Sequence, residues 1–163
     1  MKKVIIVCAI VGLAVLSGIY FVKFSPKTTQ ERDNSNQAVD FSLDQEMVNF
    51  GQMAVSDEKT AKFVLKNIGQ APLALKEFET NCNCTFAKIR TPSGESPEIN
   101  MRAHTPRGFA WKTTLNPGEE AEIFVTYKPA VMPVYGLVQR SLLFKTSDPE
   151  KPKVELKVIA VVK

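Results

Sequence analysis

From Val39 onward, apolar and polar side chains alternate in short runs that are separated by turn residues. Residues 59–67 place Ala61, Phe63 and Leu65 on one face, opposite a face that carries lysines. An alternation with a period of two is typical of a β-strand that buries one face. No run in this part of the chain keeps an apolar period of 3.6 for long enough to predict a helix. The pattern therefore predicts an all-β domain.

The same alternation recurs along the rest of the chain, in residues 47–50, 73–80, 120–127, 138–145 and 154–162. Turn sequences separate these runs, among them Asn116-Pro117-Gly118-Glu119 and Ser147-Asp148-Pro149. The number and spacing of the runs predict an immunoglobulin-like β-sandwich of about seven strands in residues 39–163. We expect its core to include Phe63, Leu65, Ile123, Val125, Leu142 and Leu156.

An uncharged apolar segment, Val4 to Val22, precedes the domain. At about 1.5 Å per residue it covers nearly the whole ~30 Å hydrocarbon thickness of a bilayer, so it predicts a transmembrane helix. A cleaved signal peptide is the alternative, with Ser17 or Gly18 before the cut, but apolar residues continue past that point. We therefore expect an uncleaved signal anchor in residues 1–23 and a polar linker in residues 24–38.

The short basic head of the chain, Lys2-Lys3, resembles the start of an export signal. It predicts a single-pass protein of the cell membrane whose C-terminal domain is periplasmic or extracellular. The net charge is +4, and setting these two lysines aside leaves 19 of the 21 basic residues against 17 acidic residues. Because no basic run is interleaved with aromatic residues, we expect no nucleic-acid partner.

The motif Cys82-Asn83-Cys84 places two of the three cysteines two residues apart, outside the apolar segment. In an extended strand their α-carbons would lie about 6.6 Å apart, at the edge of the range that a disulfide accepts. A bridge there would close almost no loop, so it would contribute little to stability in the chain-entropy description. A structural disulfide is therefore a poor explanation. A labile disulfide or dithiol and the packing of two buried thiols both remain open.

A metal site at the cysteines is a further alternative. Structural zinc requires four ligands, and beyond the two cysteines the domain offers only His104 as a further strong nitrogen or sulfur ligand. Copper(I) accepts thiolates and thioethers at low coordination, which makes Met101 and His104 candidates beside Cys82 and Cys84. The other methionines of the domain are Met47, Met53 and Met132. Core methionines and a surface histidine would explain the same residues without copper.

No residue pattern predicts catalysis, because His104 lacks a recognisable catalytic partner. We therefore expect no enzymatic activity and no cofactor other than copper(I). Residues 91–111 form a long run that contains prolines and ends with Phe109 and Trp111. Long loops on a rigid sandwich often carry recognition, which makes these two aromatic residues binding candidates. The alternative is that both cap the core.

Four turn motifs occur in order along the chain: Asn67-Ile68-Gly69-Gln70-Ala71-Pro72-Leu73, Cys82-Asn83-Cys84-Thr85, Leu115-Asn116-Pro117-Gly118-Glu119 and Thr146-Ser147-Asp148-Pro149. Together they resemble the bacterial envelope family called domain of unknown function 1573, which is similar to Hydin-type (ASH) immunoglobulin-like domains, over roughly residues 48–162. That family has Gly where this chain has Asn83, and residues 90–111 look like an insertion. The resemblance implies an immunoglobulin-like fold and export, and the family has no established activity.

Two functions are consistent with these features. The leading hypothesis is a membrane-anchored, extracytoplasmic binding or structural module that contacts an envelope protein partner through its loops. The competing hypothesis is a thiol-redox or copper(I)-handling envelope protein that uses Cys82 and Cys84.

Overall fold

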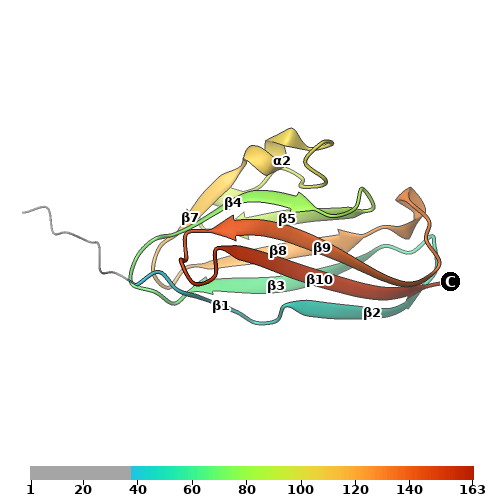
Figure 1. Cartoon of the computed structure of the whole chain (residues 1–163), viewed down its shortest axis with the longest axis horizontal. Helices are drawn as coiled ribbons and strands as arrows, with labels where there is room; N and C mark the ends of the chain where they lie inside the picture. The colour runs from blue at the N-terminus through green and yellow to red at the C-terminus, as the bar shows by residue number, and fades with distance from the viewer. Residues whose placement is uncertain (1–37) are drawn as a thin grey trace, which may run out of the picture. The chain divides into compact units, whose positions relative to one another are not determined.

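The computed structural model describes residues 38–163, which fold into two β-sheets packed face to face (Figure 1). The first sheet has the strand order β1 (Phe41–Leu43), β3 (Lys59–Asn67), β8 (Glu120–Tyr127), β5 (Thr85–Thr91) and β6 (Gly94–Glu95). The second has the order β2 (Met47–Met53), β10 (Lys153–Val162), β9 (Gly136–Thr146), β4 (Leu73–Thr80) and β7 (Lys112–Leu115). Paired strands are antiparallel, apart from β2 and β10. Two short helices lie between strands, α2 (Pro106–Ala110) and the 3-10 helix η1 (Pro129–Val131).

This architecture confirms the predicted all-β, immunoglobulin-like class. The ten strands of residues 38–163 exceed the predicted number of about seven. Strands β1, β6 and β7 are too short to show an alternation in the sequence, and β5 (Thr85–Thr91), which follows the cysteine motif, was not among the predicted runs. The helix α2 was not predicted, since it has only five residues and Pro106 at its start is its one local signal. The anchor predicted in residues 1–23, and all but the last residue of the linker, lie outside the described residues. No helix in residues 38–163 has the length and apolar character needed to cross a membrane.

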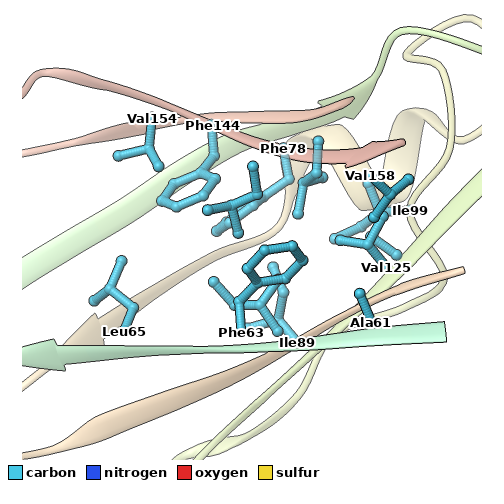
Figure 2. Close-up of a cluster of buried hydrophobic side chains, with 14 of the residues drawn as sticks. Ala61, Phe63, Leu65, Phe78, Ile89, Ile99, Val125, Phe144, Val154 and Val158 are labelled. Carbon is cyan, nitrogen blue, oxygen red and sulfur yellow. The ribbon is translucent and has the colours of Figure 1, made fainter. Parts of the chain in front are cut away.

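The core lies between the two sheets. The six side chains predicted for it, Phe63, Leu65, Ile123, Val125, Leu142 and Leu156, are all fully buried. Figure 2 shows Phe63 and Leu65 of β3 on one side of the interior, with Phe144 and Val154 of the other sheet across from them. Phe78 stacks on Phe144 with 5.1 Å between the ring centroids. Burial of one apolar face of each sheet is therefore the main source of stability in the sandwich.

Strand β4 changes its alternation at a β-bulge. Its register with β9 shifts after Lys76, and Glu77 has a φ of 57°. A bulge inserts one extra residue, so the side chains that follow it change face. As a result Phe78 and Thr80 point into the core, although the strand begins with its odd-numbered residues buried. The bulge thus brings the hydroxyl group of Thr80, two residues before Cys82, inside the domain.

The two ends of the sandwich carry different features. At one end, in the β3–β4 turn, the amide of Gln70 donates to the carbonyl oxygen of Ala38 at 2.9 Å. Gly69 is required there, because a Cβ atom would lie 2.5 Å from that same oxygen. At the opposite end, Tyr127 of β8 lies level with Lys59, the first residue of β3. The cysteine turn and the β8–β9 connection therefore lie far from the point where the described chain begins (Figure 1).

Truncation of a core side chain is expected to destabilise the domain strongly. Phe63→Ala should lower the free energy of unfolding by about 3–5 kcal/mol and Leu142→Ala by about 2–5 kcal/mol, because each leaves a cavity between the sheets. Lys62→Ala should change it by no more than about 1 kcal/mol, since Lys62 is exposed and makes a surface ion pair. Denaturant unfolding followed by the fluorescence of Trp111 measures these changes. Equal, small effects at Phe63 and Lys62 would contradict the facing of β3.

Candidate functional site

The cysteine motif forms a tight turn between β4 and β5, and a disulfide joins Cys82 to Cys84. Their α-carbons are 5.2 Å apart, closer than in an extended strand, because the chain bends: the amide of Thr85 donates to the carbonyl oxygen of Cys82 at 3.0 Å. Asn83 does not use a positive φ, since Glu77 is the one non-glycine residue of 38–163 that does. Asn83 is therefore accommodated in the turn without backbone strain.

A buried threonine supports this turn from inside the domain. The hydroxyl oxygen of Thr80 lies 3.0 Å from the carbonyl oxygens of both Cys82 and Thr85. Its single proton can serve one of these acceptors at a time. Because Thr80 is only 3% exposed, the hydroxyl group replaces water that the carbonyl oxygens lose on burial.

Two neighbouring segments add further hydrogen bonds to the turn. The side-chain amide of Asn100 donates to the carbonyl oxygens of Asn83 and Thr85 at 3.0 Å and 2.8 Å. The backbone amide of Lys128, just after β8, donates to the carbonyl oxygen of Cys84 at 2.9 Å. The turn is therefore fixed to β8 and to the segment before α2 by bonds that involve no sulfur atom.

The two sulfur atoms have different surroundings. Cys84 is fully buried, and its Sγ accepts a hydrogen bond from Nε of Arg140 at 3.1 Å. Cys82 is 7% exposed, and its Sγ accepts the backbone N–H of Cys84 at 3.1 Å. Sδ of Met132 lies 3.8 Å from Cys82 Sγ, a van der Waals contact because a bridged sulfur carries no hydrogen. The positive charge of Arg140 is thus directed at the sulfur of Cys84, whereas Cys82 lies nearer the surface.

Arg140 reaches the disulfide from β9. Its guanidinium carbon lies 5.6 Å from the centroid of the Tyr127 ring, and Nη1 donates to the carbonyl oxygen of Gln139 at 3.0 Å. None of the ion pairs found in residues 38–163 includes Arg140. Within the described part of the chain, Nε of Arg140 therefore donates to Cys84 Sγ rather than to a carboxylate.

The β8–β9 connection, next to Cys82, is apolar and exposed. Residues 129–139 contain no charged residue. The exposed apolar side chains of this stretch are Val131, Met132, Val134 and Tyr135 of the connection and Leu137 at the start of β9, which are between 41% and 77% exposed. Apolar side chains gathered on the surface in this way mark interaction sites. We call these five residues the distal apolar loop, because they lie at the end of the sandwich opposite residue 38.

The two predicted copper ligands outside the cysteine motif, Met101 and His104, lie in the segment before α2. His104 is exposed in the turn before α2, where its amide donates to the carbonyl oxygen of Met101 at 2.8 Å. Met101 lines a shallow surface pocket of about 800 Å³ together with Glu79, Thr80, Arg102, Ala103, Pro106 and Phe109. No hydrogen bond within residues 38–163 joins Met101 or His104 to either cysteine side chain. Met132 is the methionine that contacts Cys82.

The two aromatic binding candidates are also separated. Phe109 is half-buried in the same pocket, with the guanidinium carbon of Arg102 4.2 Å from its ring centroid. Trp111 packs against the core, and its ring centroid lies 5.5 Å from that of Phe78. Trp111 therefore caps the core, whereas Phe109 is reached from the surface and stays a binding candidate.

The described residues hold few groups that suit a metal ion. No cluster of three or more His, Cys, Asp or Glu side chains in residues 38–163 could bind one. Cys82, Cys84 and Met132 do bring three sulfur atoms together, and soft ligands of this kind suit copper(I) once the disulfide is reduced.

Sequence reasoning missed Arg140 and Asn100, and did not single out Met132 among the methionines. Arg140 occupies a polar position of a strand, and Asn100 lies in an irregular segment, so neither has a local signal. The uncharged, mostly apolar run of residues 129–137, between the strand patterns 120–127 and 138–145, was the sequence signal for the distal apolar loop, because connections between strands are usually polar.

The outer face of the first sheet is charged, in contrast to the distal apolar loop. Lys62 of β3 forms an ion pair with Glu122 of β8, and this hydrogen bond lowers the pKa of Glu122. Arg90 of β5 lies between Glu122 and Glu95. Exposed pairs contribute little to stability, but they keep this face hydrated.

A family model described as "HYDIN/CFA65/VesB-like, Ig-like domain" matches residues 39–160. The chain matches none of the curated proteins with which it was compared. A protein of unknown function from Porphyromonas gingivalis W83 is similar in structure, with a TM-score of 0.54, 19% identity, and coverage of 77% of this chain and 47% of that one. A family 123 glycoside hydrolase from Clostridium perfringens gives a TM-score of 0.50 at 12% identity, covering 77% of this chain and 27% of the hydrolase.

The ASH/PapD-like domain 7 of human CEP192 gives a TM-score of 0.47 at 8% identity, with coverage of 76% of this chain and 84% of that one. The chain spans about half the length of the Porphyromonas gingivalis protein. At these identities the likenesses concern the fold alone. The Hydin-type part of the predicted resemblance is confirmed, and the narrower resemblance to domain of unknown function 1573 stays a prediction.

Loss of the disulfide is expected to destabilise the domain less than loss of Asn100. The double variant Cys82→Ser/Cys84→Ser should lower the free energy of unfolding by about 1 kcal/mol or less, because the bridge closes a ring with one intervening residue. Asn100→Ala should lower the free energy of unfolding by about 1–3 kcal/mol, because the carbonyl oxygens of Asn83 and Thr85 each lose the hydrogen bond that the Asn100 side chain donates. Chemical denaturation without reductant measures both. The opposite ranking would make the disulfide the main support of the turn.

Proposed function

Because the chain belongs to the family of HYDIN/CFA65/VesB-like Ig-like domains, we propose that it is a membrane-anchored, extracytoplasmic module that binds an envelope protein. The observation that carries the binding role is the distal apolar loop. The apolar segment of residues 1–23 would hold the module at the cell membrane, with the sandwich on the periplasmic or extracellular side. The proposed role is non-enzymatic.

The distal apolar loop has the properties of a preformed binding surface. Tyr135 and Leu137 are 70% and 77% exposed, so their removal from water on binding would be favourable by roughly 25 cal/mol per Å² of apolar area. Pro129 and Pro133 fix their own φ angles and restrict the backbone of this connection. A restricted loop loses less conformational entropy when a partner binds. Both features support recognition by this loop.

A protein fits this surface better than a lipid bilayer does. Residues 129–139 carry no charge, and the two basic residues that flank them are engaged within the domain, Lys128 with Glu58 and Arg140 with Cys84 Sγ, so little positive charge is available to attract anionic head groups. An apolar segment of a neighbouring envelope protein is therefore the occupant that we propose.

Site-specific photocrosslinking in membranes tests this proposal. A photoreactive phenylalanine analogue at Tyr135 of the full-length protein should give a discrete protein adduct. The same analogue at Ile68, which is 53% exposed at the opposite end of the sandwich, is the matched control and should not give it. Leu137→Ser should reduce the Tyr135 adduct at least about fivefold without lowering the melting temperature, because the side chain is exposed and contributes little to the core.

The outcomes of this experiment are distinct. An adduct that is identical at Tyr135 and Ile68, or one that Leu137→Ser leaves unchanged, would contradict binding through the distal apolar loop. Adducts with lipid alone would replace the protein partner with the membrane surface.

Copper(I) handling is the second candidate function, and the position of Met132 is the observation that favours it. After reduction, Cys82 and Cys84 would offer two thiolates, and the thioether of Met132 already lies 3.8 Å from Cys82 Sγ. Two thiolates with one thioether form a ligand set that suits copper(I). Arg140 would offset part of the negative charge of a copper–dithiolate group.

Titration of the reduced protein with copper(I), in competition with a chromogenic chelator, checks this candidate. We expect one ion per chain, lost in Cys82→Ser/Cys84→Ser. Met132→Leu should weaken binding about tenfold, because it removes a ligand and keeps the side-chain size, whereas Met101→Leu should have no effect. Equal affinity in the wild type and Met132→Leu would exclude the site as described.

A further inference from the structure

The disulfide contributes little to the support of its own turn. It spans one residue, and the surrounding carbonyl oxygens are held by Thr80, Asn100 and the amide of Lys128. A bond that closes so small a ring removes little conformational entropy from the unfolded chain. The turn should therefore keep its shape when the disulfide opens. A disulfide can undergo exchange in the folded protein only if its surroundings keep their shape in this way.

The charge around the bridge distinguishes its two sulfur atoms. Nε of Arg140 donates to Cys84 Sγ at 3.1 Å, and no ion pair of residues 38–163 engages this guanidinium. A cation next to a sulfur atom stabilises its thiolate form, and a thiolate of lower pKa is a better leaving group. The hydroxyl oxygen of Thr85, 3.9 Å from the same sulfur, is a second donor at the edge of hydrogen-bond range. Cys84 is therefore the better leaving group of the two cysteines when the disulfide is attacked.

Access to the bridge is through the other sulfur atom. Cys84 is fully buried, whereas Cys82 is 7% exposed and has the side chain of Met132 against it. Met132 is 52% exposed and forms no hydrogen bond with the bridged sulfur, so its unbranched side chain can rotate away at little cost. An incoming thiolate would thus meet Cys82 Sγ first.

We propose that Cys82–Cys84 is an exchange-active disulfide that oxidises a protein dithiol. A thiolate of the partner dithiol attacks Cys82 Sγ; a mixed disulfide forms, the Cys82–Cys84 bond breaks, and Cys84 leaves as a thiolate paired with Arg140. The second thiolate of the partner then attacks the partner's own sulfur in the mixed disulfide and releases Cys82 as a thiolate, which takes up a proton. Two electrons pass to the bridge, and the partner dithiol becomes a disulfide. This activity goes beyond the binding role, and of the distal apolar loop it requires only that Met132 moves away from Cys82.

The site of attack is tested with a monothiol. The full-length protein in detergent, carrying Cys8→Ser so that only these two sulfur atoms report, is treated with glutathione and quenched with acid. Peptide mapping should place the glutathione adduct on Cys82. An adduct found mainly on Cys84 would overturn the assigned polarity, and reduction that proceeds only at the rate of global unfolding would overturn the proposal.

The role of Arg140 is tested by the rate of reduction with dithiothreitol. Arg140→Gln should slow reduction roughly tenfold, since an adjacent cation stabilises the thiolate that leaves. Arg140→Lys should retain most of the rate, and Lys145→Gln, which removes a positive charge farther along β9, should retain all of it. In the Cys82→Ser variant, titration of thiolate absorbance should give a higher pKa for Cys84 when Arg140 is replaced by Gln. An unchanged rate together with an unchanged pKa would show that Arg140 has only a structural role.

Discussion

The packing of two apolar sheet faces is the constraint on which the rest of this structure depends. Phe63 and its neighbours on β3 pack across the interior against side chains of β4, β9 and β10. The path of each strand must therefore keep its apolar side chains in this interior. Where β4 reaches its end, a bulge at Glu77 changes which side chains face inward, so Phe78 and then Thr80 are buried. The core thereby places a hydrogen-bonding hydroxyl group under the cysteine turn. The hydrogen bonds that support the cysteine turn therefore depend on how the two sheets pack.

A tight turn that is held by its neighbours leaves its disulfide free for another role. Side chains from three separate segments meet there: Thr80 before the turn, Asn100 before α2, and Arg140 on β9. The first two satisfy carbonyl oxygens and support the backbone, whereas Arg140 donates to sulfur. The site therefore separates the groups that maintain structure from the group that tunes reactivity. The distal apolar loop contacts the same site through Met132, which brings a proposed binding surface next to a proposed reactive bond.

Much of the fold could be predicted from local patterns. The strands Lys59–Asn67 and Glu120–Tyr127 have the bounds that their alternation indicates, because each buries one face against the opposite sheet. Leu73–Thr80 also has its predicted bounds, although its alternation changes at the bulge. Short elements such as α2 were not predicted, since five residues are too few to establish a period. The cysteine pair was identified as a site from its spacing alone. Its partner Arg140 was not, because it lies 56 residues from Cys84 in sequence and only the β9–β4 pairing brings it near. Met101 and His104 were grouped with the cysteines by residue type, and the fold places them on the α2 side, without a hydrogen bond to either sulfur.

The central claim is that hydrogen bonds and the core, rather than the disulfide, hold the cysteine turn. Native-state hydrogen exchange of the oxidised and the reduced protein tests it most directly, at the amides of Thr80 and Thr85, which donate to the carbonyl oxygens of Asn100 and Cys82. If the claim is right, protection at both amides stays within about tenfold after reduction, because the acceptors remain in place. If reduction instead abolishes protection at Thr85 and along the start of β5, the disulfide is the support of the turn and the account is wrong.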